Sequence, residues 1–184
     1  MQIRFKAHAV LLTQCFFLAV FSLHSLQSTA DEMAKEAING LLNDFHQAAA
    51  EADKERYLGY FSADGVFMGT DDWERWPLPE FTDYVGERFS GGTGWTYVSE
   101  ERFITMGPMG ASAWFDEIMV SKRWGRFRGT GVLLKENGVW KIAHYSLTAL
   151  VPNERFADVA EVATEGFQAR EADPSEESKD EKEN

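Results

Sequence analysis

The chain has 184 residues with 18 basic and 30 acidic side chains, which give a formal net charge of −12 at pH 7. This acidity argues against nucleic acid or an anionic membrane surface as the main partner. The only cysteine, Cys15, lies in an apolar N-terminal stretch, so the rest of the chain can form no disulfide and offers no thiolate to a metal.

Residues 1–30 have the pattern of a cleavable export signal. Arg4 and Lys6 precede an apolar run that ends with small residues at Ala30, and the first acidic residue is Asp31. Polar residues interrupt the run and no basic cluster follows it, which argues against a permanent membrane anchor. We therefore predict export to the periplasm or the cell exterior, with no stable membrane insertion after the signal is cleaved.

Helical spacing follows the predicted signal. Apolar residues recur three and four positions apart over residues 33–52, which predicts a long helix with one buried stripe. A shorter helix is predicted over residues 54–61 and a short strand over 66–69. Residues 70–78 have no period and predict a loop, and a proline is well placed to begin a third helix over residues 79–89.

From Trp95 onward the pattern changes to strands rich in aromatic and β-branched residues. Turn signals separate four long antiparallel strands. Asn137 and Gly138 give the clearest of these signals, because both residues accept the positive φ angles of a two-residue hairpin turn.

The C-terminal part is predicted to separate into a helix and a tail. Asn153 can cap a helix over residues 154–169 whose apolar residues share one face. Residues 170–184 are strongly acidic and almost without apolar side chains, which predicts a disordered, solvating tail. Residues 31–153 are left as one domain.

The element order predicts an α+β fold: three N-terminal helices packed on a strongly curved, mostly antiparallel sheet, plus the C-terminal helix. Together with this order, five segments of the sequence resemble the SnoaL-like branch of the nuclear transport factor 2 superfamily. The five segments are residues 67–71, 74–76, 113–117, 128–133 and 140–148.

The resemblance implies a cone-shaped domain with a pocket at its wide end and a homodimer across the open face of the sheet. In the acid–base enzymes of this superfamily, the pocket holds a carboxylate or a histidine. Ketosteroid isomerases also use a tyrosine from the first helix. Here that helix has Phe45 and His46 but no tyrosine, which argues against steroid isomerisation.

His144 is the first predicted catalytic residue. Alternation along the last strand puts it on the same face as Trp140 and Ile142, which identify the face turned toward the helices. An imidazole in that position can exchange a proton near neutral pH. The alternative is a core histidine whose nitrogens are satisfied by neighbouring side chains.

The second predicted catalytic residue is a carboxylate from the strand around residue 113. Alternation leaves open whether Asp116 or Glu117 faces the pocket, and the resemblance favours Asp116 with Trp114 beside it. A carboxylate enclosed next to an indole has a raised pKa and can act as a base. The alternative for either acid is a solvated or arginine-paired group.

Arg128 lies next to Gly129 and close to Gly131, whose missing side chains let a ligand or another backbone approach. A cation there can bind a carboxylate or enolate, and a structural ion pair is the alternative.

The remaining predicted ligand-binding residues come from the loop and from the first long strand. Trp76 is interpreted as a pocket wall, or else as packing on the sheet edge. Asp71 or Glu74 is interpreted as a group at the rim, since loops on a rigid scaffold often hold binding groups. Tyr97 adds either aromatic wall or ordinary strand packing.

No cofactor or metal is predicted. After signal cleavage only His46 and His144 remain, without the spacing of zinc ligands, and no phosphate-binding loop motif is present.

Two hypotheses for the function follow. The domain binds a small organic molecule and performs cofactor-free acid–base chemistry with His144 and Asp116, or it is a non-catalytic module. Such a module would carry a ligand or pair with another protein through the open face of the sheet, most simply as a homodimer. In the second hypothesis Tyr145, Leu147 and Leu133 would supply the apolar open face, together with Met119.

Overall fold

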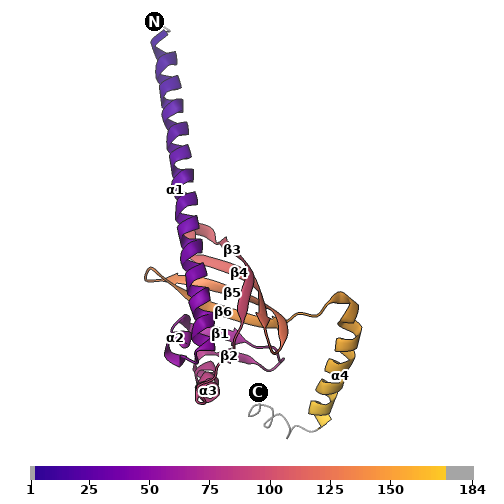
Figure 1. Cartoon of the computed structure of the whole chain (residues 1–184). Helices are drawn as coiled ribbons and strands as arrows, with labels where there is room; N and C mark the ends of the chain where they lie inside the picture. The colour runs from indigo at the N-terminus through magenta and orange to yellow at the C-terminus, as the bar shows by residue number, and fades with distance from the viewer. Residues whose placement is uncertain (1–2, 173–184) are drawn as a thin grey trace. The chain divides into compact units, whose positions relative to one another are not determined.

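The computed structural model describes residues 3–172, and the side chains of residues 27–172. It contains four α-helices and six strands among these residues, with two short 3₁₀ turns (Figure 1). In chain order they are α1 (Ile3–Ala50), α2 (Lys54–Leu58), β1 (Phe61–Met68), β2 (Arg75–Pro77), α3 (Leu78–Phe89), β3 (Val98–Met106), a 3₁₀ turn (Pro108–Gly110), β4 (Ser112–Ser121), β5 (Gly125–Glu136), β6 (Val139–Ala149), a second 3₁₀ turn (Asn153–Arg155) and α4 (Phe156–Ala172).

The strands form one curved sheet in the order β2-β1-β6-β5-β4-β3. The pair β1–β6 is parallel, whereas β1–β2, β3–β4 and β4–β5 are antiparallel. Helices α1 to α3 lie on one face of the sheet (Figure 1), here called the inner face; the opposite face is the outer face. The predicted α+β class and the mostly antiparallel sheet are confirmed. The order leaves β2 and β3 as the edge strands.

The hairpin turn between β5 and β6 forms as the sequence predicts. Asn137 has φ 49° and Gly138 has φ 86°. Both angles lie in the left-handed region, which asparagine tolerates and glycine adopts without steric cost.

Two elements differ from the sequence prediction. The second helix ends at Leu58, and Phe61 already begins β1, so the predicted helix over 54–61 was too long. The segment predicted as a loop contains β2, because its backbone pairs with β1 and sets Trp76 opposite Phe67. A strand of three residues is too short to show a period.

Helix α1 is longer at its N-terminal end than the periodicity predicted. It runs without a break through the predicted cleavage position at Ala30 and ends before Ala52, which has φ 55°. The side chains of residues 1–26, most of the predicted signal, lie outside the described residues. In the part of the chain with described side chains, no helix is both long and apolar enough to cross a membrane.

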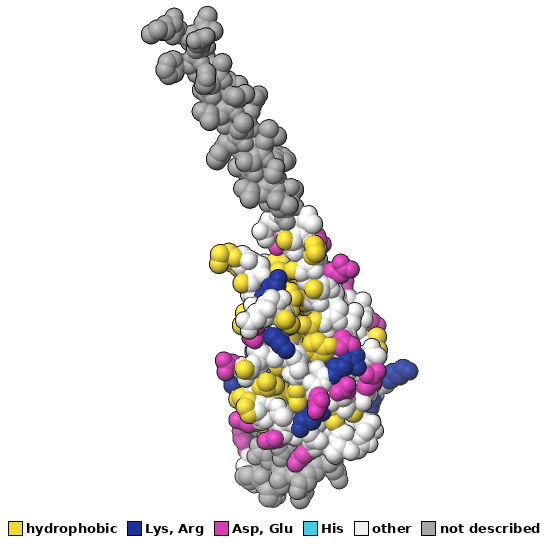
Figure 2. All heavy atoms as spheres, turned by 90° about the vertical axis from the view of Figure 1, so that its left-hand side faces the viewer, with side chains coloured by type: hydrophobic (Ala, Val, Ile, Leu, Met, Phe, Trp, Pro, Cys, Tyr) yellow, Lys and Arg dark blue, Asp and Glu magenta, His cyan; other side chains and the backbone are white. Residues whose placement is uncertain are grey.

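Aromatic rings fill much of the space between the helices and the inner face. Phe67 stacks on Phe81 with centroids 4.3 Å apart and on Tyr145 with centroids 5.5 Å apart. Phe45 of α1 stacks on Tyr57 of α2 at 4.5 Å. Such contacts add to the free energy gained from burying these large side chains. On the face shown in Figure 2, apolar side chains gather in the middle of the described part, and acidic and basic side chains lie near one another.

The chain divides after Thr148 into two compact units. The second unit contains α4, whose side chains are all exposed except the partly exposed Arg170. The helix predicted over 154–169 thus corresponds to the second 3₁₀ turn and α4. Residues 173–184 of the predicted acidic tail lie outside the described residues.

Candidate functional site: a buried cluster of His46, Glu117, Arg102 and Tyr145

Glu117 on β4 is the centre of a buried polar cluster. Its side chain is 0% exposed, and it accepts four hydrogen bonds. His46 Nε2 lies 2.7 Å and Tyr145 Oη 3.1 Å from Glu117 Oε1. Arg102 Nε and Nη2 lie 3.0 and 2.7 Å from Oε2, a two-point contact. The cluster joins α1, β3, β4 and β6.

Glu117 faces the helices because of alternation along β4. Ala113, Phe115, Glu117 and Met119 are all 3% exposed or less, whereas Trp114 between them is 49% exposed. The only acid within this buried set of four is therefore Glu117. The question that the sequence left open between Asp116 and Glu117 is decided for Glu117.

Burial alone would raise the pKa of the Glu117 carboxyl. The hydrogen bond and charge of His46 and the guanidinium of Arg102 outweigh this effect and lower the pKa of Glu117 from 4.5 to about 2. Glu117 is consequently ionised at neutral pH. Burial and then the Glu117 charge raise the pKa of Tyr145 well above 10, so its hydroxyl stays protonated and donates.

The ionised carboxylate fixes the orientation of the imidazole. A carboxylate only accepts hydrogen bonds, so His46 must carry a proton on Nε2, the nitrogen that points to Glu117. Among the described residues, Nδ1 has no hydrogen-bond partner. Nδ1 is thus the position at which a neutral His46 can accept a proton, while Glu117 stabilises the resulting positive charge.

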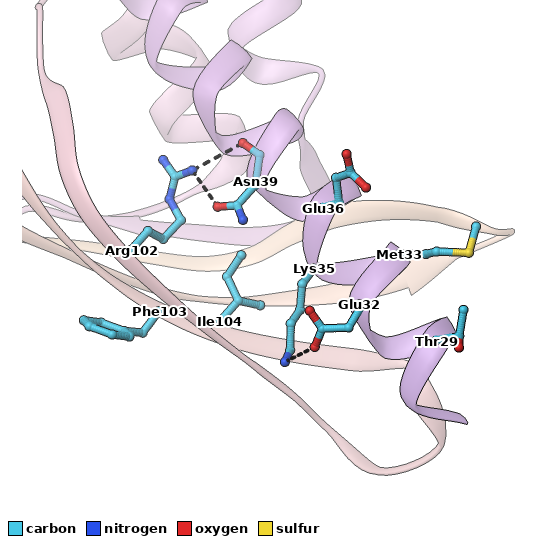
Figure 3. A pocket seen from close by; sticks show the side chains of 9 residues that line it. All are labelled: Thr29, Glu32, Met33, Lys35, Glu36, Asn39, Arg102, Phe103 and Ile104. Carbon is cyan, nitrogen blue, oxygen red and sulfur yellow. Dashed lines mark hydrogen bonds and ion pairs between the residues drawn. The ribbon is translucent and has the colours of Figure 1, made fainter. Parts of the chain in front are cut away.

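Arg102 connects this cluster to the surface of α1. Its Nη1 lies 2.9 Å from Asn43 Oδ1 and 3.2 Å from Asn39 Oδ1. Beyond Asn39 lies a groove of about 500 Å³ between α1 and β3 (Figure 3). In Figure 3, Arg102 and Ile104 point toward α1 and Phe103 points away from it.

His144 lies apart from this cluster, so the prediction that it faces the helices was wrong. It is partly buried on the outer face, where His144 Nε2 contacts Met68 Sδ at 3.2 Å. The buried residues of β6 are Trp140, Ile142 and Tyr145. The side chains that face the helices therefore shift from even to odd positions after Ile142. The pairing of β1 with β6 is irregular at this point.

Asp116 and Trp114 are exposed on the outer face, so the expectation that they line the interior was also wrong. Arg128 is exposed there too, two pairs along the ladder from Asp116. The two glycines beside it serve another purpose. A side chain at Gly129 would collide with Tyr145 Oη, and one at Gly131 would approach Phe115.

Trp76 packs among the aromatic side chains of the core. It is 8% exposed and stacks on Tyr84 with centroids 4.5 Å apart. Glu74 Oε2 accepts a hydrogen bond from the backbone of Asp71 at 2.9 Å, so these two residues close their own loop. Tyr97 is partly buried against Phe127, and burial raises its pKa. None of the four belongs to the Glu117 cluster.

His46 is not among the site residues predicted from the sequence, although the sequence contains a signal for it. His46 lies four positions after Leu42 and three before Ala49, both members of the buried stripe. Helical spacing therefore puts it on the buried side of α1. A histidine there needs a polar partner from the sheet, and Glu117 supplies it.

Comparison with known proteins identifies the fold. The sequence model of the SnoaL-like domain matches residues 38–152. A search of curated proteins finds no match.

Three solved structures show the similarity. One is an NTF2-like protein of unknown function from Pseudomonas putida, with TM-score 0.55 and 17% identity over 67% of this chain and 91% of that chain. A second is a putative scytalone dehydratase from Novosphingobium aromaticivorans, with TM-score 0.56 and 12% identity over 67% and 89%. A third is a putative calcium/calmodulin-dependent kinase II association domain from Exiguobacterium sibiricum, with TM-score 0.51 and 21% identity over 65% and 95%. At these identities the similarity shows the fold alone.

Proposed function

We propose that this chain, which belongs to the SnoaL-like domain family, binds a small organic molecule and performs cofactor-free acid–base chemistry on it with His46. The observation that carries the proposal is the 2.7 Å contact between His46 Nε2 and the ionised, fully buried Glu117. A histidine held by a carboxylate in an apolar setting has the arrangement of a general base.

The chemistry follows from the geometry of the pair. His46 Nδ1 would take a proton from a carbon or oxygen of the ligand, and the positive imidazolium would form next to Glu117. Arg102 keeps Glu117 ionised throughout, so Glu117 orients the imidazole and does not take the proton itself. Phe45 and Tyr145, with ring centroids 5.3 and 6.3 Å from that of His46, favour an aromatic or otherwise apolar ligand. Proton transfer of this kind serves isomerases and dehydratases, and one structural neighbour is a putative scytalone dehydratase.

Nuclear magnetic resonance of the imidazole groups tests this proposal. The exported protein would be titrated with a panel of phenols and aromatic ketones, which resemble the enolate and carbonyl forms of such substrates. Compounds that bind are expected to shift the His46 ring signals and to leave those of His144 unchanged, since His144 lies on the outer face. The Glu117→Gln variant should lose the response. A panel that perturbs only His144, or neither histidine, would contradict the proposal.

The site of action is part of the proposal. The basic residues, apolar run and small residues of residues 1–30 support export, followed by cleavage after Ala30. Expression of the full chain in an exporting bacterium should yield a protein outside the cytoplasm that begins at Asp31, as N-terminal sequencing would show. Retention of residues 1–30 in the cytoplasmic fraction would be the contrary result.

A second candidate function, a homodimer formed through the outer face, rests on a separate observation. Four large apolar side chains are exposed on neighbouring strands of this face: Phe103 (57%), Trp114 (49%), Val132 (38%) and Leu134 (40%). Tyr145, Leu133 and Met119, which the sequence analysis assigned to an apolar open face, are buried inside instead. A contiguous exposed apolar patch favours association. Sedimentation of the exported protein at micromolar concentration would show a dimer if this candidate is right and a monomer if it is wrong.

A further inference from the structure

The edge of the sheet at β3 lies beside the groove under α1. Strand β3 pairs with β4 on one side and has no strand on the other. Among the described residues, its backbone forms no backbone hydrogen bond outside the β3–β4 ladder. An edge of nine residues therefore presents unpaired amide and carbonyl groups, and such an edge is a template for another strand.

The groove provides space for an additional strand. It measures about 500 Å³, and it lies between the β3 segment from Arg102 to Ile104 and the part of α1 that includes Glu32, Glu36 and Asn39 (Figure 3). A strand placed beside β3 at the usual spacing of about 4.8 Å would continue the sheet and turn alternate side chains toward α1. A groove between an edge strand and a helix suits an extended peptide.

The charges along this edge favour one kind of occupant. Glu36 on α1 and Glu101 on β3 are exposed and have no ion-pair partner among the described residues. The nearby cations are already paired, Lys35 with Glu32 and Arg102 with Glu117. The unbalanced charge is therefore negative. A second copy of β3 would bring another Glu101 to an edge that already carries unbalanced negative charge, which is unfavourable.

From the free β3 edge, the groove and its negative charge, we infer that this protein binds an extended, basic peptide segment of a partner protein as a seventh strand beside β3. Backbone hydrogen bonds to β3 supply affinity, and basic side chains of the peptide meet Glu36 and Glu101. The charged contacts of this binding differ from those of the His46 site, because neither of these two acids belongs to the Glu117 cluster; Arg102 borders both sites.

A designed peptide serves as the probe: ten residues in which pairs of lysines alternate with pairs of valines, so that lysines project from both faces of the added strand. The exported protein is expected to bind it, with calorimetry giving the affinity and hydrogen exchange showing new protection of the β3 amides. The same peptide methylated on alternate backbone nitrogens keeps its charge but cannot pair, so it should bind at least about tenfold more weakly. Raising the salt concentration should weaken the binding of the unmethylated peptide to the protein.

Charge-reversal variants locate the site. Glu36→Lys and Glu101→Lys should each lower the affinity by about fivefold, the effect of an exposed ion pair. Glu80→Lys on α3 changes the net charge equally at an exposed position and should leave the affinity unchanged.

Several results would overturn the inference. One is equal binding of the methylated and parent peptides, which would mean attraction by charge without pairing. Another is that the peptide protects the amides of β2, the other edge strand, from hydrogen exchange instead of those of β3. A third is protection of β3 without peptide that increases with protein concentration, because this would identify a second copy as the occupant. Failure of the parent peptide to bind would also overturn it.

Discussion

Glu117 carries a charge in a place with no exposure to water, and three partners make this possible. Four hydrogen bonds and the Arg102 guanidinium replace the water that burial removes. Removal of a single partner leaves the others buried and unsatisfied, which costs more than the net contribution of the intact pair. The cluster is therefore sensitive to any one substitution.

Glu117→Gln should lower the free energy of unfolding by about 3 kcal/mol, the usual cost of breaking a buried ion pair. Arg102, with 6% of its side chain exposed, would keep its charge without a carboxylate. Urea unfolding of the two proteins measures the difference. Asp116→Asn, the neighbouring acid on the outer face, is the control and should change stability by less than about 0.5 kcal/mol. Equal effects of the two substitutions on stability would contradict the assignment of Glu117 to a buried ion pair.

The pH dependence of stability follows from the same carboxylate. Its pKa in the folded protein is about 2, below the ordinary 4.5. Because the folded value is the lower one, ionised Glu117 stabilises the protein above about pH 4.5, and this contribution is lost as the pH falls toward 2. The difference between these two pKa values corresponds to about 3 kcal/mol of unfolding free energy. The unfolding free energy of Glu117→Gln should fall less steeply than that of the natural protein between pH 4.5 and 2; parallel curves would be the contrary result.

Gly129 provides room for the Tyr145 hydroxyl. A methyl group at residue 129 would collide with Tyr145 Oη and press on Met119 and Glu117. Gly129→Ala should therefore destabilise the protein by about 1–3 kcal/mol, the range for overpacking a core. The control is Gly40→Ala in α1, where an added Cβ meets nothing within 4 Å. It should be neutral or stabilising by up to about 1 kcal/mol. Thermal unfolding compares them, and a neutral Gly129→Ala would mean that Tyr145 can move.

At the scale of elements, the phase of each strand decides which side chains reach the interior. Strand β4 alternates regularly, so one buried position fixes all the others. Strand β6 does not, because Ile142 and Tyr145 are both buried although they lie three positions apart. Regular alternation would have put His144 inside. This single change of phase exchanges a histidine for a tyrosine in the core.

The β5–β6 turn illustrates the reverse case, in which local chemistry is sufficient. Gly138 has φ 86° and open space around it, so Gly138→Ala should cost about 1 kcal/mol through backbone strain alone. Gly91→Ala, also in open space but without a positive φ, should cost less than half as much. Chemical denaturation of both variants checks this. Similar losses would show that the conformation of the turn is not the cause.

At the scale of the whole molecule, the two faces of the sheet have different roles. The inner face holds the aromatic core and the Glu117 cluster, and the outer face exposes Trp114 with Phe103, Val132 and Leu134. Tyr145, Leu133 and Met119, the residues predicted for a homodimer contact on the open face, lie inside. The outer face has the apolar character that such a contact needs.

Trp114→Lys should shift a dimer toward monomer, because a charge at the middle of the apolar face would have to be buried without a partner. Trp124→Lys is the matched control, since Trp124 is 57% exposed at the turn after β4, at the opposite end of that strand from Trp114. Sedimentation equilibrium at micromolar concentration is the measurement, with at least a tenfold weaker dimer expected for Trp114→Lys alone. Equal weakening by both variants would point to a different contact surface.

The sequence by itself determined the order of the helices and of the long strands, without β2, and the Asn137–Gly138 turn, because helical period, strand alternation and turn chemistry act over a few neighbouring residues. The resemblance of five segments indicated the family. Only the tertiary structure decided which side of β4 faces the helices, since Asp116 shares its strand face with Trp114 and Glu117 shares the other face with Phe115. It also decided that His46 and Glu117, 71 positions apart, meet as one pair. Contacts at that separation depend on how the sheet curves around α1 and on the phase of each strand, and no local pattern encodes either of these.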